Sequence, residues 1–358
     1  MAKFSEVLTI VNGRNQKQVV CDDGKYPIYG SGGIMGYAND YICKAETVVI
    51  GRKGSINKPI FVETPFWNVD TAFGLCANSK KLNPKYLYYF CEKFDFEKLN
   101  TTVTIPSLTK SNLLNVEIPL PNLEKQKQIV ELLDKVTSLI SLRKQQLAKL
   151  DELVKARFVE MFGDPIRNEK GWNTYTLAEM CDGIGDGLHG TPEYDENGEY
   201  PFINGNNLIS GIIQINPSTK KVNKKTYEKH YIKISQNAIL LSINGTLGRI
   251  AFYNSEQVML GKSACYCNLR DEVNRIFVYN IMKTDAFARY LEDNATKSTI
   301  KNVGLKAIRE YRLIMPPIPL QNQFSSFVER VDQQKQTVQQ SLEKLEFMKK
   351  ALMQEYLG

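Results

Sequence analysis

The sequence carries an internal repeat, and its blocks occur in the same order in both halves of the chain. The first block reads YPIYGSGGIMG from Tyr26 and YPFINGNNLISG from Tyr200. Three further blocks follow, which match residues 48–56 with 240–247, 69–72 with 261–264, and 119–126 with 316–323. The separation between matching residues grows along the chain, which indicates insertions in the second copy, and loops absorb insertions at little cost. A repeat of this kind predicts two copies of one structural unit.

Composition limits the kind of protein that this repeat can belong to. The chain has 358 residues, 42% hydrophobic and 24% charged, so it can form two or three packed domains. The net charge of +7 suits a polyanionic partner such as nucleic acid, although scattered surface lysines give the same value. The seven cysteines form no C-x-x-C pair and no signal peptide is recognisable, so we expect reduced thiols in a cytoplasmic protein. No apolar run is long enough to span a membrane.

Each copy of the repeat divides into a mixed segment and a helical segment. The mixed segments contain short runs rich in Val, Ile, Tyr and Phe between Gly, Asn and Pro, which predicts α/β domains. Within them, residues 85–99 and 275–292 are predicted to be helices. The segments Leu123 to Phe162 and Leu320 to Leu357 contain neither Gly nor Pro. We therefore expect four parts, with mixed domains over residues 1–121 and 163–317 and long helices over residues 122–162 and 318–358.

Both long helices carry apolar residues at alternating spacings of four and three, which is the heptad pattern of a coiled coil. In the first helix this seam contains Ile129, Leu133, Val136, Ile140, Leu147 and Leu150. In the second helix it contains Phe324, Val328, Val331, Leu342, Leu345 and Leu352. The seams are interrupted by four polar residues, which we expect to lie opposite apolar stems of the partner helix: Arg143, Arg157, Lys335 and Lys349.

The length of these helices limits how the chain can fold. A helix of roughly 40 residues is about 60 Å long, which is too long to bury its seam on a domain of ordinary size. We therefore expect the two helices to pair with each other in antiparallel order, and the alternative is that each helix packs on its own domain. The Leu-x-x-Gln motifs at Gln126 and Gln323 predict that one helix is about half a turn longer at its start. Gly163 is expected to end the first helix, because Gly suits the C′ position and Pro165 cannot continue the helix.

These features together resemble the specificity subunit of type I restriction-modification enzymes, over essentially the whole chain. The resemblance rests on the domain–helix–domain–helix repeat, the Pro-x-Pro-x-Leu-x-x-Gln entry to the first helix and its Phe-Gly-Asp-Pro exit. It also rests on the tract from Leu240 to Gly248. The fold implied is α/β (α+β), with two mixed α/β target-recognition domains, two long antiparallel coiled-coil helices between them and a pseudo-twofold repeat. The second proline cluster, from Pro316 to Pro319, is shifted relative to the first and departs from this pattern.

The resemblance also implies a function and partners. Each domain would bind one half of a bipartite double-stranded DNA site, and the helices would set the spacing and dock two methyltransferase subunits. Restriction (nuclease-translocase) subunits can then join the complex. No cofactor is expected on this chain, since S-adenosylmethionine would lie on the methyltransferase subunits. A spacer of ~60 Å would separate the domain centres by on the order of one to two turns of DNA.

Candidate DNA contacts in the first domain lie in Gly-bounded or polar loops. Arg and Lys can neutralise phosphates or donate to guanine, and Asn can bind adenine. The alternative for each loop is an ordinary solvated turn. The candidates are Ser31, Arg52, Lys53, Ser55, Asn57, Lys58, Thr104, Ser107 and Lys110.

The second domain has candidates in the matching loops. His189 lies in a G-x-G-x-x-G sequence, but a turn-rich stretch follows it instead of a helix, which argues against a dinucleotide site. An ordinary loop is again the alternative. The candidates are His189, Asn204, Asn206, Asn207, Asn244, Thr246, Arg249, Lys262, Lys297, Ser298, Lys301 and Asn302.

The sequence lacks the motifs of two classes of enzyme that act on DNA. An amino-methyltransferase would carry an Asn/Asp-Pro-Pro-aromatic motif, but the nearest sequence, from Met315 to Ile318, lacks both the polar and the aromatic residue. No acidic cluster with a trailing lysine marks a metal-dependent nuclease, so we expect no catalytic residues and no metal site. A protein-binding coiled-coil scaffold, or a DNA-binding regulator without restriction partners, is the remaining alternative.

Overall fold

The computed structural model describes residues 1–100 and 107–358, and the chain divides into two compact units. Unit 1 comprises Met1–Leu147 and Thr337–Gly358, and unit 2 comprises Ala148–Gln336. Each unit contains one mixed α/β region and part of each of two long helices, α4 (Leu123–Phe162) and α9 (Ile318–Leu357). Within the described ranges, no helix is both long enough and apolar enough to cross a membrane.

Unit 1 is built on a four-stranded antiparallel sheet with strand order β2-β8-β5-β6, and helix α2 packs on this sheet. A three-stranded sheet has the order β4-β3-β7, in which β3 and β7 are parallel. The strands are β1 (Ala2–Lys3), β2 (Leu8–Asn12), β3 (Tyr26–Gly30), β4 (Gly33–Ala38), β5 (Thr47–Gly51), β6 (Ile60–Val62), β7 (Trp67–Asn68), β8 (Ala72–Ala77) and β9 (Glu117–Ile118). The short helices are α1 (Phe4–Val7), α2 (Pro84–Lys93), the 3-10 helix η1 (Phe96–Leu99) and α3 (Lys110–Leu114).

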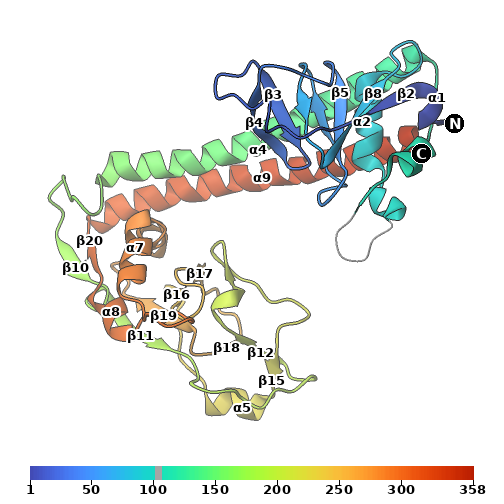
Figure 1. Ribbon diagram of the computed structural model, residues 1–358. Coiled ribbons are helices and arrows are strands. Elements are labelled where there is room, and N and C mark those ends of the chain that lie inside the picture. The colour runs from blue at the N-terminus through green and yellow to red at the C-terminus, as the bar shows by residue number, and fades with distance from the viewer. Residues whose placement is uncertain (101–106) are drawn as a thin grey trace. The chain divides into compact units, whose positions relative to one another are not determined.

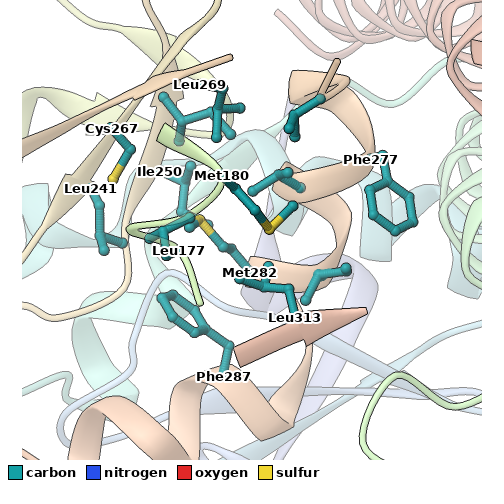
Figure 2. Close-up of a cluster of buried hydrophobic side chains, with 14 of the residues drawn as sticks. Leu177, Met180, Leu241, Ile250, Cys267, Leu269, Phe277, Met282, Phe287 and Leu313 are labelled. Atoms are coloured by element: carbon teal, nitrogen blue, oxygen red, sulfur yellow. The ribbon is translucent and has the colours of Figure 1, made fainter. Parts of the chain in front are cut away.

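Unit 2 repeats this plan with a four-stranded sheet in the order β11-β19-β16-β17 and a three-stranded sheet in the order β15-β12-β18. Its strands are β10 (Thr174–Thr176), β11 (Cys181–Asp186), β12 (Tyr200–Ile203), β13 (Leu208–Ile209), β14 (Ile212–Ile213), β15 (Lys221–Val222), β16 (Ala238–Ser242), β17 (Ile250–Phe252), β18 (Met259–Leu260), β19 (Ala264–Leu269) and β20 (Arg312–Ile314). Its short helices are η2 (Gly205–Asn207), α5 (Lys224–Lys229), α6 (Arg275–Met282), α7 (Asp285–Asp293) and α8 (Leu305–Glu310). Figure 2 shows its core, in which Leu241 of β16, Phe277 of α6 and Leu313 of β20 belong to one buried cluster.

The two units share the topology of their four-stranded and three-stranded sheets, and unit 2 adds the strand pair β13-β14. Strands β2, β8, β5 and β6 correspond to β11, β19, β16 and β17. The parallel pair β3 and β7, in which Ile28 faces Trp67, corresponds to β12 and β18, in which Phe202 faces Met259. This correspondence confirms the duplication that the sequence repeat predicts.

The two helices predicted within the mixed domains are each divided in two. The first forms α2 and η1, and the second forms α6 and α7. In both cases a capping residue restarts the helix, because the side chain of Asp95 accepts a hydrogen bond from Glu97 N–H and that of Thr284 accepts one from Phe287 N–H.

The two long helices pair in antiparallel order within each unit (Figure 1). In unit 1, Val136 and Ile140 of α4 cluster with Leu342 of α9, and Lys144 forms an ion pair of 2.9 Å with Glu346. Unit 2 has Asp151 paired with Lys335 at 2.5 Å, and the rings of Phe162 and Phe324 lie 5.5 Å apart. In unit 2 the contacting residue of α9 falls from Lys335 to Phe324 as that of α4 rises from Asp151 to Phe162, which confirms the antiparallel coiled coil. The alternative of two separate helices is wrong.

The heptad seam is buried or half-buried along its length. Ile129 and Leu133 belong to the core of unit 1, and Phe324, Val328 and Val331 belong to that of unit 2. Leu147, Leu150, Leu345 and Leu352 are half-buried.

The polar interruptions of the seam have polar partners, and Arg157 also lies against the partner helix as expected, with its guanidinium 5.8 Å from the ring centroid of Phe327 on α9. Lys349 binds Glu92 at 2.8 Å, and Arg157 binds Glu160 at 2.8 Å. Burial alone would lower the pKa of Lys335, but its hydrogen bond to Asp151 and the charge of that carboxylate outweigh burial, so the pKa is raised.

Helix α4 ends where the sequence predicts, since Gly163 has a φ of +76° and its N–H bonds to the carbonyl of Val159. The prediction of unequal helix starts is wrong, because both helices contain 40 residues. Pro319 lies in the first turn of α9, where its missing N–H has no partner to lose, so the shifted prolines do not delay the helix. The residue equivalent to Gln126 is therefore Gln321 and not Gln323.

Contacts confirm this equivalence. Gln126 is fully buried; its Oε1 accepts the backbone N–H of Asn83 at 2.7 Å, and its Nε2 donates to Pro121 O at 2.8 Å. Gln321 is also fully buried; it accepts the N–H of Asn274 at 3.0 Å and donates to Pro316 O at 2.7 Å. Each glutamine thus joins the start of a long helix to the N-cap of α2 or α6.

We expect Gln321→Ala to lower the free energy of unfolding by about 3 kcal/mol, because it leaves the partly buried N–H of Asn274 and the buried carbonyl of Pro316 without that partner. Gln323→Ala is the matched control, since Gln323 lies on the same helix, is exposed and should change stability by less than about 0.5 kcal/mol. Denaturant unfolding of the full chain measures both. Equal effects of the two substitutions would contradict the corrected register.

Candidate nucleic-acid interface

Three loops of unit 2 meet around an open hollow of about 750 Å³. They are the turn after β12, the loop after β16 and the segment before α8. Five of the predicted contact residues line this hollow: Asn204, Asn206, Asn244, Thr246 and Lys301. The structure therefore brings together residues that lie up to 97 positions apart, from Asn204 to Lys301.

Two serine hydroxyls hold these loops in place. Ser242 is fully buried; its Oγ donates to Thr246 O at 2.6 Å and accepts the N–H of Arg249 at 2.9 Å. Ser263 Oγ donates to Asn204 Oδ1 at 2.9 Å and accepts the N–H of Gly205 at 3.0 Å. The loops are thus fixed by the strands that carry them, which suits recognition of a defined surface.

The matching loops of unit 1 have the same backbone arrangement. Lys53 and Ser107 form an antiparallel bridge, as do Asn244 and Asn302 in unit 2. In unit 1, Leu108 N–H donates to Arg52 O at 2.9 Å, and in unit 2 the N–H of Val303 donates to Ile243 O at 2.9 Å. Both copies therefore place the loop after the central strand beside the segment before the next short helix.

Some predicted contact residues of unit 1 have their polar groups engaged within the protein. Asn57 Nδ2 donates to Asp95 Oδ1 at 2.9 Å, and its Oδ1 accepts the N–H of Phe96 at 2.7 Å. Lys110 Nζ donates to the carbonyl of Ile10 at 2.8 Å. These side chains hold loops together, and in this structure they are not available for bases.

Other predicted residues of unit 1 are accessible. Lys53, Ser55 and Lys58 are exposed, and the guanidinium of Arg52 lies 5.7 Å from the ring centroid of Phe73. Thr104 lies outside the described residues.

Ser31 lies where the β3–β4 turn approaches the end of β5. A Cβ added at Gly51 would lie 3.1 Å from Ser31 Cβ, and in unit 2 a Cβ added at Gly205 would lie 2.7 Å from Ser242 Cβ. In both units the turn after the first strand of the three-stranded sheet lies against the end of a central strand of the four-stranded sheet, and a glycine makes room for a serine there. The glycine lies on the strand in unit 1 (Gly51) and on the turn in unit 2 (Gly205).

Among the remaining candidates of unit 2, several are engaged in contacts within the protein. Asn207 accepts the N–H of Asn204 and donates to Gln214 O, and Arg249 donates to Asn206 O. The ammonium of Lys301 forms an ion pair with Glu292. Ser298 Oγ donates to the carbonyl of Ile300 within its own loop.

Three exposed candidates of unit 2 differ in their contacts. The side chains of Lys262 and Lys297 make no hydrogen bond or ion pair with the described residues, and each presents a positive charge to solvent. His189 Nε2 lies 2.7 Å from Asp186 Oδ2.

Sequence reasoning missed part of the hollow. Its lining also contains Leu247, Ser263, Glu292 and Ile300. Ser263 was detectable from the sequence, because the third repeat block matches it with Thr71. The structure agrees with this match, since the backbone carbonyl of each residue accepts an N–H from the loop after the central strand. Glu292 carried no such signal, since it lies on a helix outside every repeat block.

The interface offers two kinds of chemistry. The amides and hydroxyls of the hollow can donate to and accept from base edges, whereas the exposed lysines around it can neutralise phosphates. In residues 1–100 and 107–358 there is no group of three or more His, Cys, Asp or Glu side chains that could hold a metal ion.

Comparison with known proteins finds relatives by sequence and by fold. The chain is 24% identical over 363 residues to a Haemophilus influenzae protein named as a type I restriction enzyme specificity subunit, covering 92% of this chain and 86% of that protein. It is 24% identical over 318 residues to the type I restriction enzyme MjaIX specificity subunit of Methanocaldococcus jannaschii, covering 78% of this chain and 68% of the relative. The crystal structure of the S subunit of a type I restriction-modification system from M. genitalium has a similar fold. Its TM-score is 0.63 at 17% identity, and the match covers 100% of this chain and 95% of that one.

A family model covers nearly the whole chain. The model described as the type I restriction modification DNA specificity domain matches residues 1–152 and 169–346, so it includes both copies of the repeat. The chain therefore belongs to the family of type I restriction-modification DNA specificity proteins.

Proposed function

We propose that this chain is the non-catalytic, sequence-specific DNA-binding specificity subunit of a type I restriction-modification complex. Residues 1–121 and 163–317 act as two target-recognition domains, and each reads one half of a bipartite site. Residues 122–162 and 318–358 form the spacer between them. One observation carries this proposal. The same two loops meet at the same place in both copies of the fold, through a bridge between Lys53 and Ser107 in unit 1 and between Asn244 and Asn302 in unit 2.

A bipartite target follows from the duplication. Two related domains joined by paired helices match two separated stretches of DNA, as dimeric DNA-binding proteins match two half-sites. Because the loop residues differ between the two copies, the half-sites differ in sequence. The amides around the unit 2 hollow favour direct contact with base edges, and Lys262 and Lys297 favour contact with phosphates.

The long helices also supply a surface for partners. Leu139 and Leu142 of α4 are 45% and 58% exposed in unit 1, and Val159 is 55% exposed in unit 2. Apolar side chains exposed on a helix pair are typical of protein-binding surfaces. We propose that two methyltransferase subunits, which would carry S-adenosylmethionine, dock on the helices, and that restriction subunits join this complex in the cytoplasm.

We expect the full chain, co-purified with its methyltransferase subunits, to enrich one bipartite sequence from a pool of random duplexes. The isolated chain should transfer no radiolabelled methyl group to DNA, whereas the complex should. Sequencing of the bound pool and scintillation counting measure the two results. Methyl transfer by the chain alone would refute the non-catalytic role, and lack of any enriched sequence would favour a protein-binding scaffold.

We expect seven residues inserted at matching places in both long helices to lengthen the non-specific gap of the target by roughly three base pairs. One heptad adds about 10.5 Å of helix, and B-DNA rises about 3.4 Å per base pair. The same insertion in α4 alone should disrupt the helix pair and lower the unfolding midpoint. An unchanged gap in a folded double insertion would show that the helices do not set the spacing.

We expect Lys297→Gln to weaken DNA binding equally for all sequences and to reduce the slope of log affinity against log salt by about one. Lys301→Gln is the matched control, because Glu292 already neutralises that ammonium and the slope should change less. Titrations of labelled duplex at several salt concentrations measure both slopes. A larger change of the salt slope for Lys301→Gln than for Lys297→Gln would contradict the assignment of phosphate contact to Lys297.

A further inference from the structure

One pair of matched positions differs in chemistry between the two units although its backbone is the same. Position 53 in unit 1 and position 244 in unit 2 are each bridged to the segment before the next short helix. The glycine that follows has nearly the same conformation in both copies, with a φ of +80° at Gly54 and +76° at Gly245. Differences in what these positions bind therefore come from their side chains.

In unit 2 this position carries an amide whose orientation is fixed. Asn244 Nδ2 donates one hydrogen to Asn302 Oδ1 at 3.1 Å, on the wall of the hollow. The second Nδ2 hydrogen and Oδ1 make no bond to the described residues. A donor and an acceptor thus remain side by side, which is the pattern that pairs with N7 and the N6 amino group of adenine. Guanine presents acceptors at both N7 and O6, so it would place O6 against Asn244 Oδ1.

In unit 1 the same position carries a group that only donates. Lys53 is exposed, and its ammonium makes no hydrogen bond or ion pair with the described residues. Its backbone N–H is held by the carbonyl of Thr71. An ammonium can donate to both N7 and O6 of guanine, whereas the N6 amino group of adenine would repel it. Ser107, which occupies the place of Asn302, has no amide that could orient a neighbour.

We propose that positions 53 and 244 determine base specificity, with Lys53 selecting guanine in the half-site of unit 1 and Asn244 selecting adenine in the half-site of unit 2. Asn302 is a positioning residue that fixes the Asn244 amide. This inference rests on the proposed function, because it assumes that both loops face DNA. It goes further by naming one base in each half-site and the side chain that reads it.

The test is selection from a duplex pool by the full chain co-purified with its methyltransferase subunits. The variants are Asn244→Lys and Lys53→Asn, which exchange the two chemistries. Asn244→Lys should change one position from adenine to guanine in one half-site, and Lys53→Asn should cause the reverse change in the other half-site. Each preference should shift by about tenfold or more.

Two further variants serve as controls. Lys58→Asn removes a charge from the same loop as Lys53 and should weaken binding without changing the enriched sequence. Asn302→Ser gives unit 2 the unit 1 residue and should reduce the preference for adenine over guanine while the rest of the sequence stays the same. If Asn244→Lys fails to fold, as judged by its unfolding midpoint, Asn302→Ser decides the question for unit 2.

The outcomes separate this inference from the proposed function. Folded exchange variants that bind DNA and retain the wild-type sequence would overturn the inference and leave the bipartite function intact. A change of the same half-site by both variants would also overturn it. If the wild-type complex enriches no bipartite sequence, the proposed function itself fails.

Discussion

The antiparallel pairing of α4 and α9 is the constraint on which both units depend. Neither helix can bury its heptad seam on a single domain, and each unit therefore takes the start of one helix and the end of the other. The core of unit 1 includes Met353 and Leu357 of α9 together with Ile129 and Leu133 of α4. Unit 2 is one continuous stretch of chain, Ala148–Gln336, whereas unit 1 combines Met1–Leu147 with Thr337–Gly358 and completes its core with the end of α9.

Two buried glutamines connect this helix pair to the α/β regions. Gln126 and Gln321 each bond to the N-cap residue of a short helix and to a carbonyl of the proline segment. A long helix that is held at its first turn has a fixed direction relative to the domain before it. The proline clusters assist, because they leave few backbone donors that would need other partners.

Features that repeat with a regular spacing were predictable from the sequence. The duplication, the ends of α4 and the antiparallel seam follow from periodicity, Gly163 and helix length. The register of α9 was not, because Gln323 fits a Leu-x-x-Gln pattern after Leu320, whereas Gln321 follows Ile318 and only its burial shows that it is the residue equivalent to Gln126.

The candidate interface was predictable at the level of loops but not of individual side chains. Gly and Asn identify the turns, and these turns do converge around the unit 2 hollow. However, Asn57 and Lys110 bind groups at positions 95, 96 and 10, and no local pattern reveals such partners. Likewise, no local pattern predicts that Glu292 of α7 lines the hollow.

Because α4 and α9 are each shared between the two units, the units are completed at different times during biosynthesis. Every residue of unit 2 has been made once Gln336 leaves the ribosome, whereas unit 1 still lacks Thr337–Gly358. At ordinary translation rates this delay is on the order of seconds. The region that is translated first is thus the last to complete its core, and a premature stop between Gln336 and Met353 would remove core residues of unit 1 while unit 2 keeps its whole sequence.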